Sequence, residues 1–442
     1  MIMTKKQIKL GVFLMGTGHH IASWRHPDAQ ADASENVEFF KEVAIKAEQG
    51  KLDMLFLSDG LSFNELSHPA EQVRFEPLTL LSVLSTVTKN IGLTGTASTT
   101  YNEPFHIARK FSSLDHLSRG RAAWNIVTSY YEAEASNFNQ DKHLDHSLRY
   151  DRADEFVEVV KGLWDSYEDD ALARNKETGE YIKKGKLHTL NHKGEYYSVR
   201  GPLNSSRPPQ GRPVLVQAGS SEAGTTLAAK QADVIFTAQQ TLADAQSFYK
   251  KLKDKAVAAG RNRDDIKIMP GVSVYVAETE EKARAKYEEL QQLITPEIGL
   301  DFLEDYLGID LSGYDLDGPL PKDIPPTNGN RSRQQLIIEL AERENLTIRE
   351  LYLKIAGSRG HRIIFGSPSQ IADQLIEWVD NDAADGFNLM PPYFPGGFTD
   401  FIDLVIPELQ KRGVFRTEYE GNTLRENLGL QQVPSRYALQ QV

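Results

Sequence analysis

The stretch Val214–Gly224, VLVQAGSSEAG, has the clearest structural pattern in this chain. A short apolar run leads into Gly219, Ser220 and Ser221, and a helical pattern begins directly after them. This pattern predicts a strand that ends at the N-terminus of a helix. Such a helix start presents unpaired backbone N–H groups and the positive end of the helix dipole, which favour a bound phosphate. An ordinary βα turn with a serine N-cap explains the same residues, so this stretch by itself leaves both interpretations open.

Outward from this stretch, apolar strand patterns alternate with amphipathic helix patterns along most of the chain. Seven further strands are expected, at 8–15, 54–59, 91–98, 121–129, 234–237, 269–276 and 386–390. Helical crossovers and apolar strands are typical of an all-parallel sheet. Eight such units predict an α/β fold of the (β/α)8 TIM-barrel type, with a doubly wound open sheet as the rival fold.

The alternation is interrupted twice by long polar stretches, at about 165–213 and 295–360. We expect both to be insertions in a single TIM-barrel domain that covers residues 1–412. The last residues, 413–442, are polar and are expected to form a C-terminal tail on the surface.

The composition limits the functional classes. With 442 residues, of which 40% are hydrophobic, the chain is long enough to bury a large core. Its net charge of −12 argues against nucleic acid or an anionic membrane surface as a partner. The absence of cysteine excludes disulfides, thiolate metal sites and a cysteine nucleophile. The sequence has no recognisable signal peptide and no apolar run that would span a bilayer, so a cytoplasmic protein is expected.

Several common catalytic motifs are absent from the sequence. Gly16-Thr17-Gly18 resembles the start of a dinucleotide fingerprint, but Ile21 stands where the third glycine is required. The sequence contains no HExxH motif, no G-x-S-x-G elbow and no cluster of histidines and carboxylates with metal-ligand spacing. Hydrolysis by a metal or by a serine nucleophile is therefore poorly supported, and no metal is expected.

In a barrel, functional side chains lie at the C-terminal ends of the strands. The expected strand ends are rich in hydroxyl and amide groups and poor in charge, and they include His19, His20, Asp59, Thr96, Asn125, Ser129, Ser220 and Ser221. Such a rim suits a large polar cofactor that carries a phosphate.

Four segments together resemble the bacterial luciferase-like flavin monooxygenases, in particular the branch of nitrilotriacetate and dibenzothiophene-sulfone monooxygenases. They are GVFLMGTGHHIASWRHPDA (11–29), MLFLSD (54–59), RAAWNIVTS (121–129) and QAGSSEAG (217–224). The resemblance covers nearly the whole chain. It implies a barrel that binds FMN and works in a two-component system, in which a separate NAD(P)H-dependent flavin reductase supplies FMNH2 and O2 is the co-substrate. It also implies a homodimer or homotetramer, with no nucleic-acid or membrane partner.

The resemblance implies a small organosulfur or aminopolycarboxylate substrate, such as N-acetyl-S-(2-succino)cysteine, and cleavage of a C–S or C–N bond. Two other functions remain open on the same barrel. One is hydride transfer coupled to a deazaflavin or NAD, and the other is flavin binding without catalysis.

Carried onto this sequence, the resemblance places Asp59 at the polar edge or ribityl chain of the flavin. It places Thr96 at the pyrimidine side of the ring, and Asn125 and Ser129 at the ribityl or phosphate group. Each has an ordinary explanation as well, since an acidic N-cap, a strand threonine and a turn-forming pair are common.

The phosphate end of the cofactor is assigned to two further pairs. His146 and Tyr150 are four residues apart and share one face of an expected helix. Ser220 and Ser221 would bind the phosphate through their hydroxyl and backbone N–H groups. Without the resemblance, an exposed histidine and a core tyrosine would be the better explanation of the first pair.

Catalytic and substrate-binding groups are harder to assign. His19 and His20 are the catalytic candidates, either to orient the oxidant or as acid–base groups, although paired loop histidines can simply contact solvent. An anionic substrate needs a cationic partner, and the candidates are Arg25, His26, Arg331 and Arg333. The insertion at 295–360 is a candidate lid, with a structural excursion or subunit contact as the alternative.

Overall fold

The computed structural model of the chain describes residues 5–64, 67–327 and 331–437. Eight parallel strands form a closed barrel, because β8 pairs with β9 and β11 pairs with β1. In order around the barrel they are β1 (Lys9–Leu14), β2 (Met54–Leu57), β3 (Gly92–Ser98), β4 (Ala122–Val127), β7 (Val214–Ala218), β8 (Val234–Thr237), β9 (Lys267–Val276) and β11 (Gly386–Leu389). The predicted TIM barrel is thus confirmed, and an open doubly wound sheet is excluded by the closure.

One further strand of this sheet was not predicted. β10 (Arg362–Gly366) runs parallel to the second half of β9, from the pair Arg362↔Val272 to the pair Gly366↔Val276. β9 continues beyond the barrel, and the short run RIIFG of β10 pairs with this outer part of β9. The sequence pattern of so short a run did not separate it from the insertion before it.

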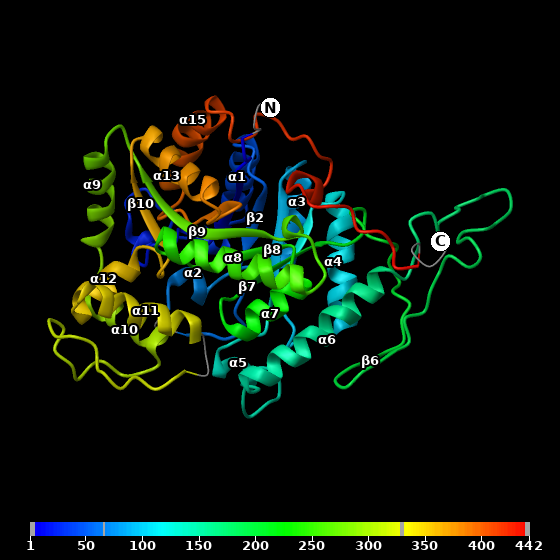
Figure 1. The fold of residues 1–442 in the computed structure, drawn as a ribbon, viewed down its shortest axis with the longest axis horizontal. Coiled ribbons are helices and arrows are strands. Elements are labelled where there is room, and N and C mark those ends of the chain that lie inside the picture. Colours follow the sequence, from blue (N-terminus) through cyan, green and yellow to red (C-terminus); the bar gives the residue numbers. More distant parts are fainter. Residues whose placement is uncertain (1–4, 65–66, 328–330, 438–442) are drawn as a thin grey trace.

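Helices cover the outside of the barrel (Figure 1). Apolar side chains on the outer face of the strands, such as Val12, Leu55 and Trp124, pack with these helices into the main core. The helices of the barrel are α1 (Val37–Gln49), α2 (Pro69–Gln72), α3 (Pro77–Val87), α4 (Pro104–Ser118), α5 (Glu132–Ser136), α6 (His146–Trp164), α7 (Glu222–Gln231), α8 (Leu242–Ala258), α9 (Glu280–Gln291), α13 (Pro368–Asp380), α14 (Gly396–Asp400) and α15 (Ile406–Lys411). None of the helices in the described ranges has the length and hydropathy needed to cross a membrane.

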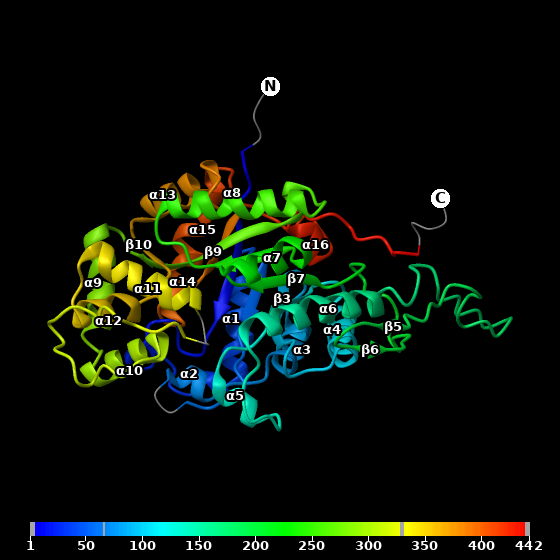
Figure 2. The ribbon, with the colours of Figure 1, turned by 60° about the horizontal axis from the view of Figure 1, so that its bottom comes forward.

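The two insertions have different structures. Residues 165–213 extend away from the barrel and contain the small hairpin of β5 (His192–Lys193) and β6 (Ser198–Val199) (Figure 1). The second insertion is largely helical and groups α10 (Pro296–Leu307), α11 (Arg331–Glu344) and α12 (Ile348–Ala356) at one side of the barrel (Figure 2). These three helices have an apolar core of their own, which includes Leu303, Ile337 and Leu351.

The C-terminal segment differs from the surface tail that its polarity suggested. Its short helix α16 (Leu424–Asn427) places Leu424 and Leu428 in one buried cluster with Met54 and Val214 of the barrel interior. Arg425 donates to Asp233, just before β8, at 2.8 Å, and both side chains are buried. Burial alone would raise the pKa of Asp233, but the guanidinium groups of Arg425 and Arg212 lower it to about 2. The segment around α16 therefore closes the base of the barrel.

Candidate active site

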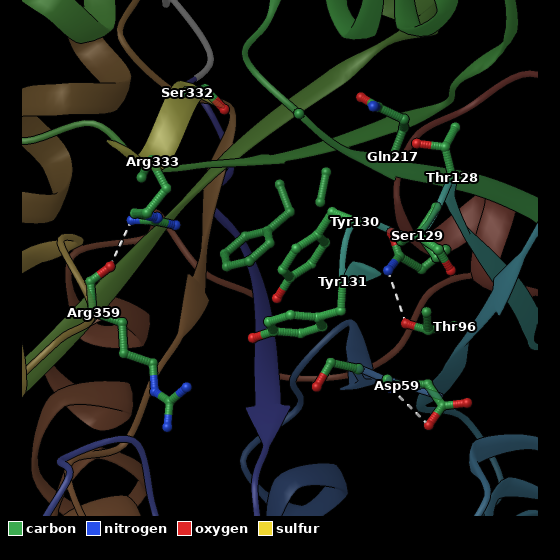
Figure 3. Close-up of a pocket in the computed structure, with 18 of the residues that line it drawn as sticks. Asp59, Thr96, Thr128, Ser129, Tyr130, Tyr131, Gln217, Ser332, Arg333 and Arg359 are labelled. Atoms are coloured by element: carbon green, nitrogen blue, oxygen red, sulfur yellow. Dashed lines mark hydrogen bonds between the residues drawn. The ribbon is translucent and has the colours of Figure 1, made fainter. Parts of the chain in front are cut away.

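A cavity of about 310 Å³ lies at the C-terminal ends of the barrel strands. Its walls come from the segments after β2, β4 and β7, from β3 and β8, and from the helical insertion (Figure 3). All eight residues predicted to bind the cofactor line this one cavity: Asp59, Thr96, Asn125, Ser129, His146, Tyr150, Ser220 and Ser221. The barrel thus brings together residues that lie more than 160 positions apart in the sequence.

Two residues that line this cavity, Asn125 and Gln217, have buried amide side chains. Thr96 and Asn125 are partners in the β3–β4 register, and Asn125 Nδ2 donates to Thr96 Oγ1 at 2.8 Å. Thr96 Oγ1 in turn donates to the Leu57 carbonyl at 2.7 Å. Asn125 Oδ1 and Gln217 Oε1 are buried and have no hydrogen-bond partner within the described ranges. A buried acceptor without a donor is costly, so this pair is suited to N–H or O–H groups of a ligand.

Ser129 is held in a strained conformation at the rim. Its φ of +59° lies in the left-handed region, which is uncommon for a residue other than glycine. Its hydroxyl contacts the Ser98 hydroxyl at 2.8 Å, and its carbonyl accepts from the buried guanidinium of Arg149 on α6. Strain of this kind persists where the surrounding contacts fix the residue, and it is concentrated at functional sites.

The Gly-Ser-Ser turn forms a helix N-cap and also lies on the cavity wall. Ser221 is the N-cap of α7, and its hydroxyl accepts from the Gly224 amide at 3.1 Å. Ser220 Oγ contacts Thr237 Oγ1 at 2.9 Å, and both residues line the cavity. At Gly219, an added Cβ would lie 2.7 Å from Gln217 Nε2 and 3.6 Å from the Tyr150 hydroxyl, so the glycine allows these side chains to lie against the turn.

The helix α6 supplies the other side of this end of the cavity. His146 and Tyr150 lie on one face of it, with ring centroids 4.9 Å apart. Desolvation and the nearby Arg149 and Arg331 guanidinium groups lower the pKa of His146. The predicted pairing of these two side chains toward one ligand is therefore geometrically possible.

Asp59 is the one predicted carboxylate on the cavity wall. Its Oδ1 accepts from the Gly60 amide at 3.0 Å. Burial raises the pKa of Asp59 to about 6, although Arg74 acts in the opposite direction. Asp59 therefore takes up a proton at a higher pH than an ordinary aspartate, although it is mostly ionised at pH 7.

His19 and His20 are not among the side chains that line the cavity. The chain turns after β1 through Gly18, whose φ is +132° and whose added Cβ would meet the Pro392 carbonyl at 2.5 Å. His19 Nε2 then bonds the Phe13 carbonyl at 3.0 Å, and His20 Nε2 bonds Gln291 Oε1 at 3.2 Å. Desolvation lowers the pKa of His19 to about 3 and that of His20 to about 4. Both rings are buried and neutral at pH 7, and a catalytic role for them stays a prediction.

The four candidate cations for an anionic substrate divide into two groups. Arg331 and Arg333 line the cavity. Arg25 is exposed and bonds the Leu293 carbonyl, whereas His26 stacks on Tyr393 with ring centroids 4.1 Å apart. Neither of the latter two is among the lining residues.

Several lining residues lie outside the predicted set: Glu71, Tyr130, Tyr131, Gln217, Arg359 and His361. Gln217 is the first residue of the quoted QAGSSEAG motif. Its place in this motif, near the end of a predicted strand, is the feature of the sequence that could have identified it as a site residue. Tyr130 and Tyr131 pack against each other with ring centroids 4.2 Å apart and the ring planes tilted by 40°. Desolvation raises the pKa of both phenol groups. Tyr131 donates to Asp305 of α10 at 3.4 Å, which joins the barrel rim to the helical insertion.

Comparison with known proteins decides what kind of barrel this is. A family model described as luciferase-like monooxygenase matches residues 15–384. The chain belongs to the luciferase-like monooxygenase family. It is 64% identical to an N-acetyl-S-(2-succino)cysteine monooxygenase of Bacillus subtilis, over 98% of this chain and 99% of that protein. It is 52% identical to nitrilotriacetate monooxygenase component A of Aminobacter aminovorans, over 96% and 97% of the two chains.

A solved structure supports the same family. The riboflavin lyase RcaE, solved with a modified FMN and riboflavin, shares 33% identity and a TM-score of 0.87 with this chain, and the match covers 97% of both. The resemblance inferred from four sequence segments is thus confirmed, and the chain is a monooxygenase of this family. Within the described ranges no group of three or more histidine, cysteine or carboxylate residues could hold a metal ion.

The raised pKa of Asp59 predicts a pH-dependent gain in stability for Asp59→Asn. The folded-state pKa of about 6 lies above the ordinary value of 3.8, so ionisation of Asp59 destabilises the folded protein as the pH rises through this window. Removing the charge should raise the free energy of unfolding by about 1–3 kcal/mol at pH 8, and by less as the pH falls toward 5. Urea unfolding at several pH values measures this. A difference that stays constant across that range would contradict it.

Proposed function

We propose that this protein is the oxygenating component of a two-component flavin system. It binds FMN as FMNH2, which a separate NAD(P)H-dependent flavin reductase supplies, and uses O2 to oxygenate a small organosulfur or aminopolycarboxylate substrate. The observation that carries this proposal is the pair of buried acceptors, Asn125 Oδ1 and Gln217 Oε1, beside a serine turn at a helix N-terminus. An isoalloxazine ring offers N–H and C=O groups at one edge, and FMN ends in a phosphate.

The cavity residues fit the two ends of such a cofactor. Thr96 would hold the polar edge of the ring, and Asn125, whose Oδ1 has no partner among the described residues, would accept from a hydroxyl of the ribityl chain beside it. At the other end, Ser220, Ser221 and the N-terminus of α7 would bind the phosphate, with His146 and Tyr150 of α6 beside it. The similarity to RcaE, whose structure contains a modified FMN, supports the same assignment.

Reduced flavin, when bound, supplies the electrons with which O2 is activated for transfer of one oxygen atom. The chain's own residues would bind and orient the cofactor and the substrate, and they would exclude water from the site. Tyr130 and Tyr131 line the cavity beside α10, where the hydrogen bond from Tyr131 to Asp305 would help to limit the access of water to a ligand. His361 is held by Arg333, whose Nη2 lies 3.0 Å from His361 Nε2, and it stacks on Phe236. Neutral histidine in this position can orient a substrate group without adding charge.

The substrate class follows from the relatives. The two curated relatives act, by their names, on N-acetyl-S-(2-succino)cysteine and on nitrilotriacetate, and the second is named as one component of its enzyme. With 64% identity over almost the full length, N-acetyl-S-(2-succino)cysteine is the first substrate to test. Cleavage of its C–S bond after oxygenation would release a thiol.

Cofactor binding is tested by Ser220→Ala. Because a hydrogen bond to a charged acceptor contributes about 1.5–3 kcal/mol, the variant should bind FMN about 10-fold or more weakly. Fluorescence titration of FMN measures this without turnover. Ser113→Ala is the matched control, since this exposed helix serine donates only to the Arg109 carbonyl. The proposal fails if the wild-type protein does not bind FMN or FMNH2, or if both variants bind it equally.

The reaction is tested by coupling the protein to a flavin reductase with FMN and NAD(P)H. Oxygen uptake and substrate loss are expected only in the complete mixture, with sulfones, sulfonates, aminopolycarboxylates and S-succinylated thiols as the panel. Mass spectrometry should find the gain of one oxygen atom or the release of a thiol. Turnover without O2 would instead favour hydride transfer, and FMN binding without any product would favour a non-catalytic flavin carrier.

A further inference from the structure

The charge of the cavity is opposite to that of the whole chain. Among its described lining residues are two carboxylates, Asp59 and Glu71, and five arginines: Arg74, Arg149, Arg331, Arg333 and Arg359. The chain as a whole has a net charge of −12. A cationic cavity in an acidic protein concentrates anions, because low-dielectric walls strengthen the local field.

Two of these arginines form hydrogen bonds to backbone carbonyl groups of the protein. Arg149 donates to the carbonyl of Ser129, and Arg74 Nη2 donates to the carbonyl of Glu71 at 2.8 Å. Figure 3 shows Arg333 and Arg359 on the opposite side of the cavity from Asp59, Thr96 and Gln217, with Tyr130 and Tyr131 between the two groups. This second side is therefore the place to look for substrate contacts.

Arg359 is fixed in place with one donor group left over. It has φ +54° after α12, its side chain is only 8% exposed, and its Nη1 donates to Glu71 Oε1 at 2.6 Å. The guanidinium also lies over the Phe302 ring at 5.5 Å. Arg359 Nη2 is buried and has no hydrogen-bond partner within the described ranges. A buried guanidinium N–H without an acceptor is costly, so this atom fits an anionic ligand.

Arg333 is coupled to the same position. Its Nη1 donates to the Arg359 carbonyl at 2.6 Å, and its Nη2 lies 3.0 Å from His361 Nε2 (Figure 3). Arg333 belongs to α11 and Arg359 follows α12, so the helical insertion supplies both cations to a site that the barrel strands surround. Two positive charges on one wall favour a ligand with two carboxylates, and Arg359 Nη2, which has no hydrogen-bond partner among the described residues, is the donor that one of them could accept from.

We propose that Arg359 and Arg333 form a carboxylate subsite that selects substrates with a dicarboxylate group, such as a succinyl thioether. This rests on the proposed function for the substrate, although binding of the carboxylates does not require the flavin. Neutral organosulfur compounds, such as sulfones and simple thioethers, would leave Arg359 Nη2 without a charged acceptor, because Glu71 accepts from Nη1, and the subsite would disfavour them.

The test compares N-acetyl-S-(2-succino)cysteine with the derivative in which its two succinyl carboxylates are methyl esters. Calorimetric titration of the wild-type protein, both flavin-free and loaded with oxidised FMN, should show the acid binding at least about 10-fold more tightly than the ester. Arg359→Gln and Arg333→Gln should each weaken binding of the acid by about 10- to 100-fold and leave the affinities for the ester and for FMN unchanged. Arg25→Gln, outside the cavity, is the matched control and should bind both compounds as the wild-type protein does.

Arg359→Gln leaves Glu71 without its ion-pair partner and can fail to fold. Arg359→Lys keeps the ion pair but loses the fork of donors, so it should weaken binding of the acid while Glu71 stays paired. The proposal is overturned if the wild-type protein binds acid and ester equally, or if the arginine variants weaken both compounds to the same extent. Failure of the proposed function has a different signature, in which FMN does not bind while the acid and ester still differ on the flavin-free protein.

Discussion

Hydrogen bonds between β8 and β9, and between β11 and β1, close the eight parallel strands into a ring. Because all strands run the same way, this closure brings their C-terminal ends to one mouth. Asp59, Asn125 and Ser220 thereby reach a common cavity from three separate strands. The opposite end is filled by Leu424 and by the buried pair of Arg425 and Asp233, so a ligand has access from the mouth.

The mouth combines two kinds of wall. The barrel side offers hydroxyl and amide groups in fixed positions, of which Asn125 Oδ1 and Gln217 Oε1 are without a partner among the described residues. The insertion side offers Arg333 and Arg359, with their guanidinium groups held by backbone and side-chain contacts. A cofactor assigned to the rigid barrel and a substrate assigned to the insertion would meet in the space between. This division explains how one barrel can keep its cofactor while insertions vary the substrate.

The sequence predicted the strands of the barrel, because these depend on local apolar patterns and on the regular alternation of strands and helices. The eight strands follow from apolar runs. The residues predicted to bind the cofactor came from the family resemblance, and they share one cavity because parallel strands bring their C-terminal ends together. Arg359 and Glu71 were missed because they come from long connections whose path depends on tertiary packing, such as that of the α10–α12 core. His19 is not a lining residue, because its ring packs against Phe13 and its Nε2 bonds the Phe13 carbonyl, a contact that spacing alone does not reveal. The burial of Leu424 was missed because a four-residue helix is too short to show periodicity.

We expect the mouth of the barrel to be the place where one oxygen atom passes from O2 to a carboxylate-bearing substrate, with separately supplied FMNH2. Turnover under 18O2, with a flavin reductase, NAD(P)H, FMN and N-acetyl-S-(2-succino)cysteine, measures this directly when a carbonyl product is reduced at once with borohydride, before its oxygen exchanges with water. One 18O atom is then expected in the oxygenated product by mass spectrometry, and none when the label is in water. An unlabelled product formed at the same rate without O2 would contradict it.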